Sequence, residues 1–197
     1  MNVTLVLFLI LLNGIFALSE IAIVSSRRAR LARMADAGSR GADRAIALAA
    51  EPTRFLSTVQ VGITAIGILN GAIGEAALAA PIRERLSLFP ALAPYADELA
   101  FGLIVIVLTY FSLIFGELVP KRIALLAPER LAAAIALPME GLARVGRPIV
   151  AVLSASTDAV LRLLRIGTVK QPAVTPEEIK VLLEEATREG VFEPSEQ

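Results

Sequence analysis

The chain has 197 residues, of which 56% are hydrophobic and only 19% are charged, and its 19 basic and 19 acidic side chains cancel. About a quarter of the residues of an average soluble domain are charged, so this composition excludes an ordinary soluble domain and indicates a membrane protein. Because the chain has no Cys and no His, disulfides, zinc sites and the Ser-His-Asp and Cys-His types of catalysis are excluded for it. No catalytic motif and no basic tract with interleaved aromatics is present, so we expect neither an enzyme nor a nucleic-acid partner.

Three apolar runs, at residues 3–24, 55–80 and 99–119, are long enough to cross a lipid bilayer, which requires about 20 residues for a helix. The first run starts without the charged segment that precedes the apolar part of a signal peptide, so we expect it to stay in the mature protein. The predicted fold class is an all-α membrane protein with three transmembrane helices, accompanied by cytoplasmic juxtamembrane amphipathic helices.

The arginines predict how the spans are oriented. The first connection is rich in arginine, whereas the second holds only Arg83 and Arg85 beside acidic residues, and the third span is followed by Lys121 and Arg122. The arginines of the first connection are Arg27, Arg28, Arg30, Arg33, Arg40, Arg44 and Arg54. By the positive-inside rule, we expect a multi-pass protein of the cell (inner) membrane with its N-terminus outside and its C-terminus in the cytoplasm.

The segments between and after the spans are also expected to be ordered. Residues 27–50 are rich in Ala, Leu and Arg and predict interfacial helices, broken at 36–41 by two glycines. The outer connection, 81–97, contains three prolines and predicts a short structured turn. These segments and the spans together make a transmembrane core over residues 1–130.

After the core, residues 131–170 are apolar enough to suggest a fourth span, but charged residues interrupt them and Pro138 and Pro148 are expected to cut the helix. We favour juxtamembrane amphipathic helices for this stretch. Residues 171–197 contain the capping box Thr175-Pro176-Glu177-Glu178 and predict an acidic cytoplasmic helix ending near Gly190. This tail is expected to lead into a cytoplasmic domain that the chain lacks.

Several polar residues lie inside the apolar runs, where they are costly and therefore indicate function. At about 1.5 Å per residue, six of them lie within about 12 Å of one another in depth, on the cytoplasmic half. These are Ser19, Glu20, Gln60, Thr64, Ser112 and Glu117. Pro120 also frees the backbone carbonyl of Gly116, as unwound turns do in transporters. Carboxylate, hydroxyl and carbonyl oxygens suit a hard cation.

Each of these features also has a purely structural interpretation. Glu20 or Glu117 can pair with Arg27, Arg28 or Lys121 at the interface. Hydroxyls in helices commonly bond to their own backbone, which applies to Ser19, Thr64 and Ser112. Gly67 and Gly71 form a small-xxx-small pair, which predicts either a dimer seam or close packing inside the subunit.

In three blocks, 13–20 (NGIFALSE), 60–64 (QVGIT) and 115–121 (FGELVPK), and in the acidic tail 175–194, the chain resembles the transmembrane domain of the CNNM/CorC family of magnesium transport and efflux proteins. The resemblance implies a homodimer in the lipid bilayer that moves magnesium outward and is regulated by a C-terminal cytoplasmic domain. Ser19, Gly116 and Glu117 are the residues that best match the family's magnesium ligands. The complete predicted metal site is Ser19, Glu20, Thr64, Asn70, Gly116 and Glu117.

The chain departs from the family pattern at Ala17, where a second serine is common, and around Ile63 and Gly67, where asparagines are common. Asn70 or Thr64 would then supply the missing ligand. The departures resemble the branch called hemolysin-like, from which no toxin activity is inferred. They leave two alternatives to magnesium efflux, namely an exporter of another cation such as an organic diamine, and a non-transporting membrane dimerisation or sensor module.

Overall fold

A computed structural model describes residues 2–164, and this part of the chain is helical without a strand. The elements are α1 (Asn2–Ser25), α2 (Arg28–Asp36), α3 (Arg40–Ala50), α4 (Pro52–Ser87), the 3-10 turn η1 (Ala93–Tyr95), α5 (Ala96–Leu113), the π-helical turn η2 (Ile114–Leu118), α6 (Val119–Leu126) and α7 (Pro128–Leu163). The predicted acidic helix in 171–197 lies outside the described residues.

Three stretches of helix are long and apolar enough to span a membrane: Val3–Ser25, Pro52–Ser87 and Ala93–Leu126. The last stretch comprises η1, α5, η2 and α6. No further candidate span exists among residues 2–164, so α7 is not one. The predicted all-α membrane fold with three spans is therefore confirmed, while the outward orientation of the N-terminus stays a prediction.

The first span is the central helix of the three. In its most apolar 18-residue stretch, 50% is buried inside the protein, against 17% in the corresponding stretch of each of the other two spans. It packs against α4 on one side and against η2 and α6 on another. Small buried residues such as Ala17 and Ala22 allow this close packing, and the Phe16 ring fills the space left by the missing side chain of Gly62. Because α4 and α5 are less buried than α1, many of their apolar side chains are exposed on the protein surface, where lipid can contact them.

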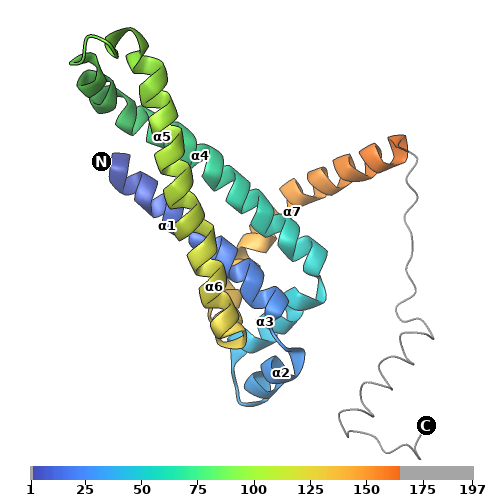
Figure 1. Cartoon of the computed structure of the whole chain (residues 1–197). Helices are drawn as coiled ribbons and strands as arrows, with labels where there is room; N and C mark the ends of the chain where they lie inside the picture. The colour runs from blue at the N-terminus through green and yellow to red at the C-terminus, as the bar shows by residue number, and fades with distance from the viewer. Residues whose placement is uncertain (1, 165–197) are drawn as a thin grey trace, which may run out of the picture. The chain divides into compact units, whose positions relative to one another are not determined.

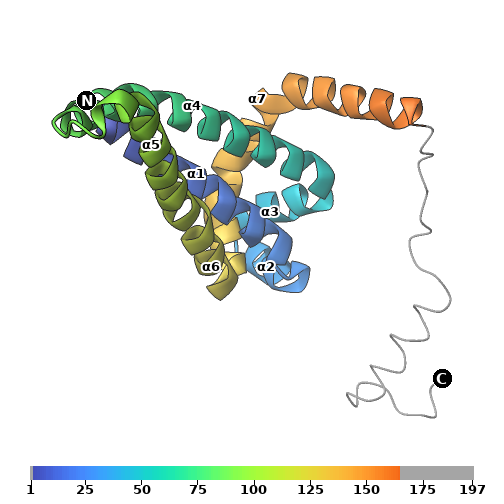
Figure 2. The same cartoon turned by 45° about the horizontal axis from the view of Figure 1, so that its top comes forward.

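The two ends of the three long helices differ in character. Figures 1 and 2 show α2 and α3 at one end and the α4–α5 connection at the other. At the arginine-rich end, Gly38 adopts a positive φ of 92° after α2, and the Ser39 hydroxyl caps α3 by accepting a bond from the Ala42 amide. The predicted break at 36–41 is confirmed. At the other end, Arg83 and Asp97 form an ion pair between α4 and α5.

Two predictions about prolines were wrong. Pro138 and Pro148 do not cut α7, which runs from Pro128 to Leu163, and Pro81 does not start a turn, because α4 continues to Ser87. A proline inside a helix removes one backbone donor and clashes with one preceding carbonyl. Around Pro81 and Pro138 the alanine- and leucine-rich sequence favours helix strongly enough to continue it, whereas around Pro148 the local residues, among them Gly146 and Val150, do not explain why the helix continues.

The chain divides into two compact units, residues 1–154 and 155–197. In the first unit, α7 buries Ala132, Ala136 and Met139 against the other helices. Gly41 of α3 lies so close to the carbonyl of Ala133 that no side chain fits there. Of the second unit, the structure describes residues 155–164, which form the last turns of α7 and are mostly exposed.

Glu129 links the end of the first span to the start of α7. Its carboxylate is buried, accepts a bond of 3.4 Å from the backbone amide of Arg27 and lies 3.7 Å from the Arg30 guanidinium. The pKa of the Glu129 carboxyl is lowered, first by its own backbone N–H and then by the amide of Arg27 and the charge of Arg30, against an opposing effect of burial. An anion in the first turn of α7 is also favoured by the helix dipole.

We therefore expect Glu129→Gln to lower the free energy of unfolding by about 1 kcal/mol at neutral pH. Since the pKa of Glu129 is lowered on folding from its ordinary value of 4.5, its stabilising effect is present above this pH and is lost as the pH falls through the folded-state value. Thermal unfolding in detergent should show a difference between wild type and variant at pH 7 that shrinks below pH 4.5. A difference independent of pH would mean that the charge of Glu129 is not what stabilises this contact.

Candidate functional site

The third span changes its helical pitch where the sequence reads Phe115-Gly116-Glu117. Residues Ile114–Leu118 form a π-helical turn, and Pro120 follows it in the first turn of α6. Such turns occur often at functional sites. Pro120 has no N–H to donate to the carbonyl of Gly116, which lies four residues before it. That carbonyl accepts a bond of 3.1 Å from the side-chain amide of Asn13 in α1 instead.

Glycines allow α1 and the π turn to approach each other here. A Cβ at Gly14 would lie 2.8 Å from the Phe115 carbonyl oxygen, and a Cβ at Gly116 would lie 3.2 Å from the Asn13 amide nitrogen. Asn13 is partly buried, and its side-chain oxygen is buried without a hydrogen-bond partner among the described residues. In this contact the carbonyl of Gly116 has a hydrogen-bond donor, whereas the side-chain oxygen of Asn13 is an acceptor that a ligand can satisfy.

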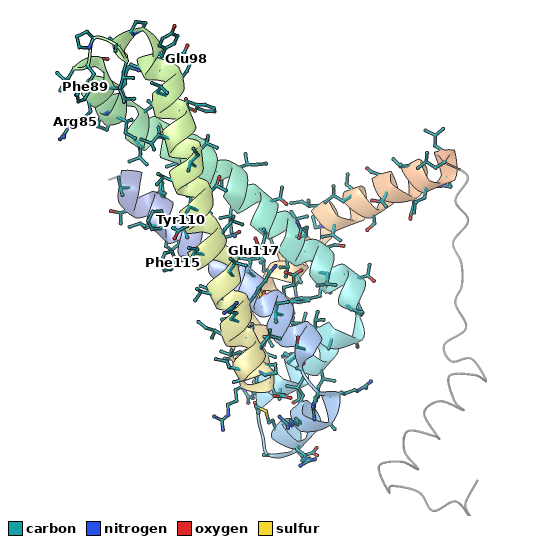
Figure 3. The ribbon with its side chains drawn as sticks, in the orientation of Figure 1. Arg85, Phe89, Glu98, Tyr110, Phe115 and Glu117 are labelled. Carbon is teal, nitrogen blue, oxygen red and sulfur yellow. The ribbon has the colours of Figure 1, made fainter. Side chains whose placement is uncertain are left out.

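Two carboxylates of the predicted site converge on one ammonium group. The Nζ of Lys121 lies 2.7 Å from Oε1 of Glu117 and 3.6 Å from Oε2 of Glu20. Figure 3 shows Glu117 on the opposite side of the third span from Phe115. The side chains of Glu20, Lys121 and Glu117 are 24%, 30% and 43% exposed, so both carboxylates and the ammonium group are accessible from the protein surface. Among the cationic partners considered for these carboxylates, the structure shows Lys121 paired with both of them.

The hydroxyl and amide residues of the prediction are not gathered around these carboxylates by any described bond. Ser19 is completely buried, and its hydroxyl donates a bond of 2.7 Å to the carbonyl of Phe16 in its own helix. Thr64 is exposed on α4. Asn70 is buried and donates a bond of 3.1 Å to the Ser112 hydroxyl, which joins α4 to α5. Its side-chain oxygen, like that of Asn13, is buried without a partner among the described residues.

The structure thus divides the polar residues into two groups. The first joins α1 to the third span through Asn13, Gly116, Glu20, Lys121 and Glu117, and we call it the α1–α6 site. The second joins α4 to α5 through Asn70 and Ser112. Within residues 2–164, no three acidic side chains lie close enough together to hold a metal by themselves. Any cation at the α1–α6 site would need neutral oxygens as well as the two carboxylates.

Sequence reasoning left two members of the α1–α6 site out of its predicted metal site. Asn13 lies in the middle of an apolar run, and an amide in that place is itself a signal of function. Lys121 follows Glu117 by four residues, the spacing at which helical side chains pair. Both signals were present in the sequence, but a lysine ammonium is not a metal ligand, and Asn70 was chosen as the amide ligand in place of Asn13.

The fold and the site define a helical membrane domain with three spans and a polar, carboxylate-bearing site between the first and third. The family model described as the cyclin M transmembrane N-terminal domain, CNNM, matches residues 4–196. The chain belongs to this family.

Relatives match nearly the whole chain. The UPF0053 protein sll0260 of Synechocystis is 49% identical over 189 residues, which cover 96% of this chain and 42% of the relative. The polyamine export protein of Salmonella typhimurium is 31% identical over 195 residues, covering 99% of this chain and 43% of the relative. The uncharacterized protein MT1889 of Mycobacterium tuberculosis is 32% identical over 196 residues, covering 98% and 56%. The chain therefore spans about half of the length of these relatives or less.

Proposed function

We propose that this chain is the membrane domain of a cation exporter and that its cargo is an organic polyamine. The observation that carries the proposal is the position of Lys121, whose ammonium lies between the carboxylates of Glu117 and Glu20 at 2.7 and 3.6 Å. A primary ammonium on an alkyl chain is the chemical group that ends a polyamine. The α1–α6 site therefore already accommodates the group that the cargo would present.

The cargo would enter by exchange with Lys121. An ammonium group donates up to three hydrogen bonds and prefers ionised acceptors, which the two carboxylates supply. Glu20 lies seven residues after Asn13 in α1, which places both on one face of the helix about 10 Å apart. The unpartnered oxygen of Asn13 is a second acceptor at that distance. Two acceptor positions along one helix suit an extended cation with more than one amine.

The polyamine export proteins among the relatives support this assignment, because they are about 30% identical to this chain over nearly its whole length. The carboxylate end of the site faces the cytoplasm in the orientation that the arginines predict, which is the side from which an exporter takes its cargo. A homodimer stays part of the proposal, and the open space beside Gly67 and Gly71 on α4 supports a seam there.

Magnesium is the second candidate, as the sequence first suggested. The observation in its favour is a set of three oxygens: the Gly116 carbonyl, which accepts from the Asn13 side chain, the Asn13 oxygen, which has no partner among the described residues, and the carboxylate of Glu117. These are oxygen ligands of the kind that Mg²⁺ binds, and they would supply about half of the octahedral shell that it requires. Ser19, Thr64 and Asn70 would have to change partners or positions to complete the predicted site.

The two cargoes can be distinguished in proteoliposomes that contain the purified protein. We expect spermidine or putrescine to move across the bilayer and to raise the thermal unfolding temperature, and an equal concentration of Mg²⁺ to do neither and not to compete. Glu75→Gln serves as a control, because Glu75 is exposed and far along α4 from the carboxylates. Stabilisation and flux with Mg²⁺ alone would establish the second candidate. Flux of neither cation would favour a non-transporting module.

A further inference from the structure

A basic cavity lies away from the α1–α6 site, between α3, the start of α4 and α7. Its volume is about 140 Å³. Four arginines and two glutamates line it together with apolar residues. The charged residues are Arg44, Glu51, Arg54, Glu140, Arg144 and Arg147.

Two helix faces form the cavity, and both repeat the same spacing. Arg44 and Leu48 lie on one face of α3, which Glu51 follows as its C-cap, and Glu140, Arg144 and Arg147 lie on one face of α7. The first turn of α4 contributes Arg54 and the buried ring of Phe55. These three helices bring the four arginines to the lining of one cavity.

The cavity carries an excess of positive charge. Glu140 accepts bonds from both Arg44 and Arg144, at 3.4 and 3.3 Å, and Glu51 pairs with Arg54 at 3.1 Å. No carboxylate among the described residues pairs with Arg147. Four guanidinium groups against two carboxylates leave a formal charge of about +2. Guanidinium groups bind phosphate in a planar, two-point geometry, so an anionic phosphate fits this excess better than a metal or an amine does.

The cavity also lies at the depth of lipid headgroups. The 36 residues of α4 measure about 54 Å at 1.5 Å per residue, whereas the hydrocarbon core is about 30 Å thick. Residues 55–74 of α4 carry no charged side chain and measure about 30 Å, so this stretch matches the hydrocarbon core and Arg54 falls at its edge.

We propose that the basic cavity binds a phosphate-bearing anion, with the phosphate on Arg54, Arg144 and Arg147, and that the ligand is the headgroup of an anionic phospholipid. Basic pockets beside membrane spans recognise such headgroups. The bound lipid would hold α3, α4 and α7 together at the membrane surface. This inference does not depend on the identity of the transported cation, and its test measures binding and not transport.

The test compares soluble short-chain lipids on the purified protein in detergent. We expect dihexanoyl-phosphatidylglycerol to raise the thermal unfolding temperature and dihexanoyl-phosphatidylcholine not to do so at equal concentration. Arg147→Gln should weaken phosphatidylglycerol binding about tenfold, because it removes one charge-assisted contact and breaks no described ion pair. Glu140→Gln should strengthen the binding, since it frees Arg44 and Arg144 from a competing carboxylate.

The matched control is Arg122→Gln, which removes the charge of an exposed arginine outside the cavity. It should leave phosphatidylglycerol binding unchanged. Equal stabilisation by both lipids, or an equal loss in Arg122→Gln and Arg147→Gln, would overturn the proposal. If inorganic phosphate stabilised the protein at the same concentration as phosphatidylglycerol does, the proposal of a lipid ligand would be wrong. The ligand of the cavity would then be a soluble phosphate compound.

Discussion

Replacing Gly41 with alanine should lower the free energy of unfolding by about 2–3 kcal/mol, a large effect for one methyl group. A Cβ at this position would overlap the backbone carbonyl of Ala133 in α7. Backbone atoms cannot rotate out of the way as a long side chain can, so α3 and α7 would have to move apart. Thermal or denaturant unfolding in detergent micelles measures the change.

Gly141→Ala is the matched control for Gly41→Ala. Gly141 lies in the same helix as Ala133, and an added Cβ there meets no atom within 4 Å. Because alanine is the better helix former by up to about 1 kcal/mol, the control should be as stable as the wild type or more so. An unchanged stability for Gly41→Ala would mean that α3 and α7 are less closely packed than the structure has them. The same variant should weaken lipid binding, since these two helices also form the basic cavity.

The coarse fold could be predicted from the sequence because a membrane imposes strong constraints on composition. Long apolar runs have few structural alternatives, and three of them appear as helices that can span. The ends of the helices were harder to predict. Pro81 and Pro138 are ordinary signals of a helix end, but the residues around them favour helix on both sides, and α4 and α7 continue past them.

The candidate site could be predicted only in part, because depth in the membrane gives one coordinate of a side chain and not its direction. Glu20 and Glu117 were placed at similar depth, and they do share a partner. Thr64 was placed near them in depth but is exposed on α4. The direction of a side chain depends on which face of its helix packs against a neighbour. An example is the close approach of Gly14 to the π turn. Such packing is decided by all three helices together and cannot be seen in the sequence of one of them.

Removing the charge of Glu117 and removing the charge of Lys121 should change cargo binding in opposite directions. Glu117→Gln loses the closer carboxylate of the pair, at 2.7 Å from the ammonium, and should weaken polyamine binding and transport about tenfold to a hundredfold. Glu20→Gln should have a smaller effect in the same direction, because its carboxylate is 3.6 Å away. Proteoliposome flux and a binding titration of labelled spermidine measure both quantities.

Lys121→Met tests the competition between the protein's own ammonium and the cargo. It should tighten spermidine binding about tenfold, since the two carboxylates then have no internal partner, and it should slow release. The cost in stability should be below about 1 kcal/mol, because the ion pair is partly exposed. Arg122→Gln removes a neighbouring exposed charge and should leave binding unchanged. Weaker binding in Lys121→Met would make Lys121 a part of the cargo site and not its competitor, and the exchange mechanism would then be wrong even if export itself holds.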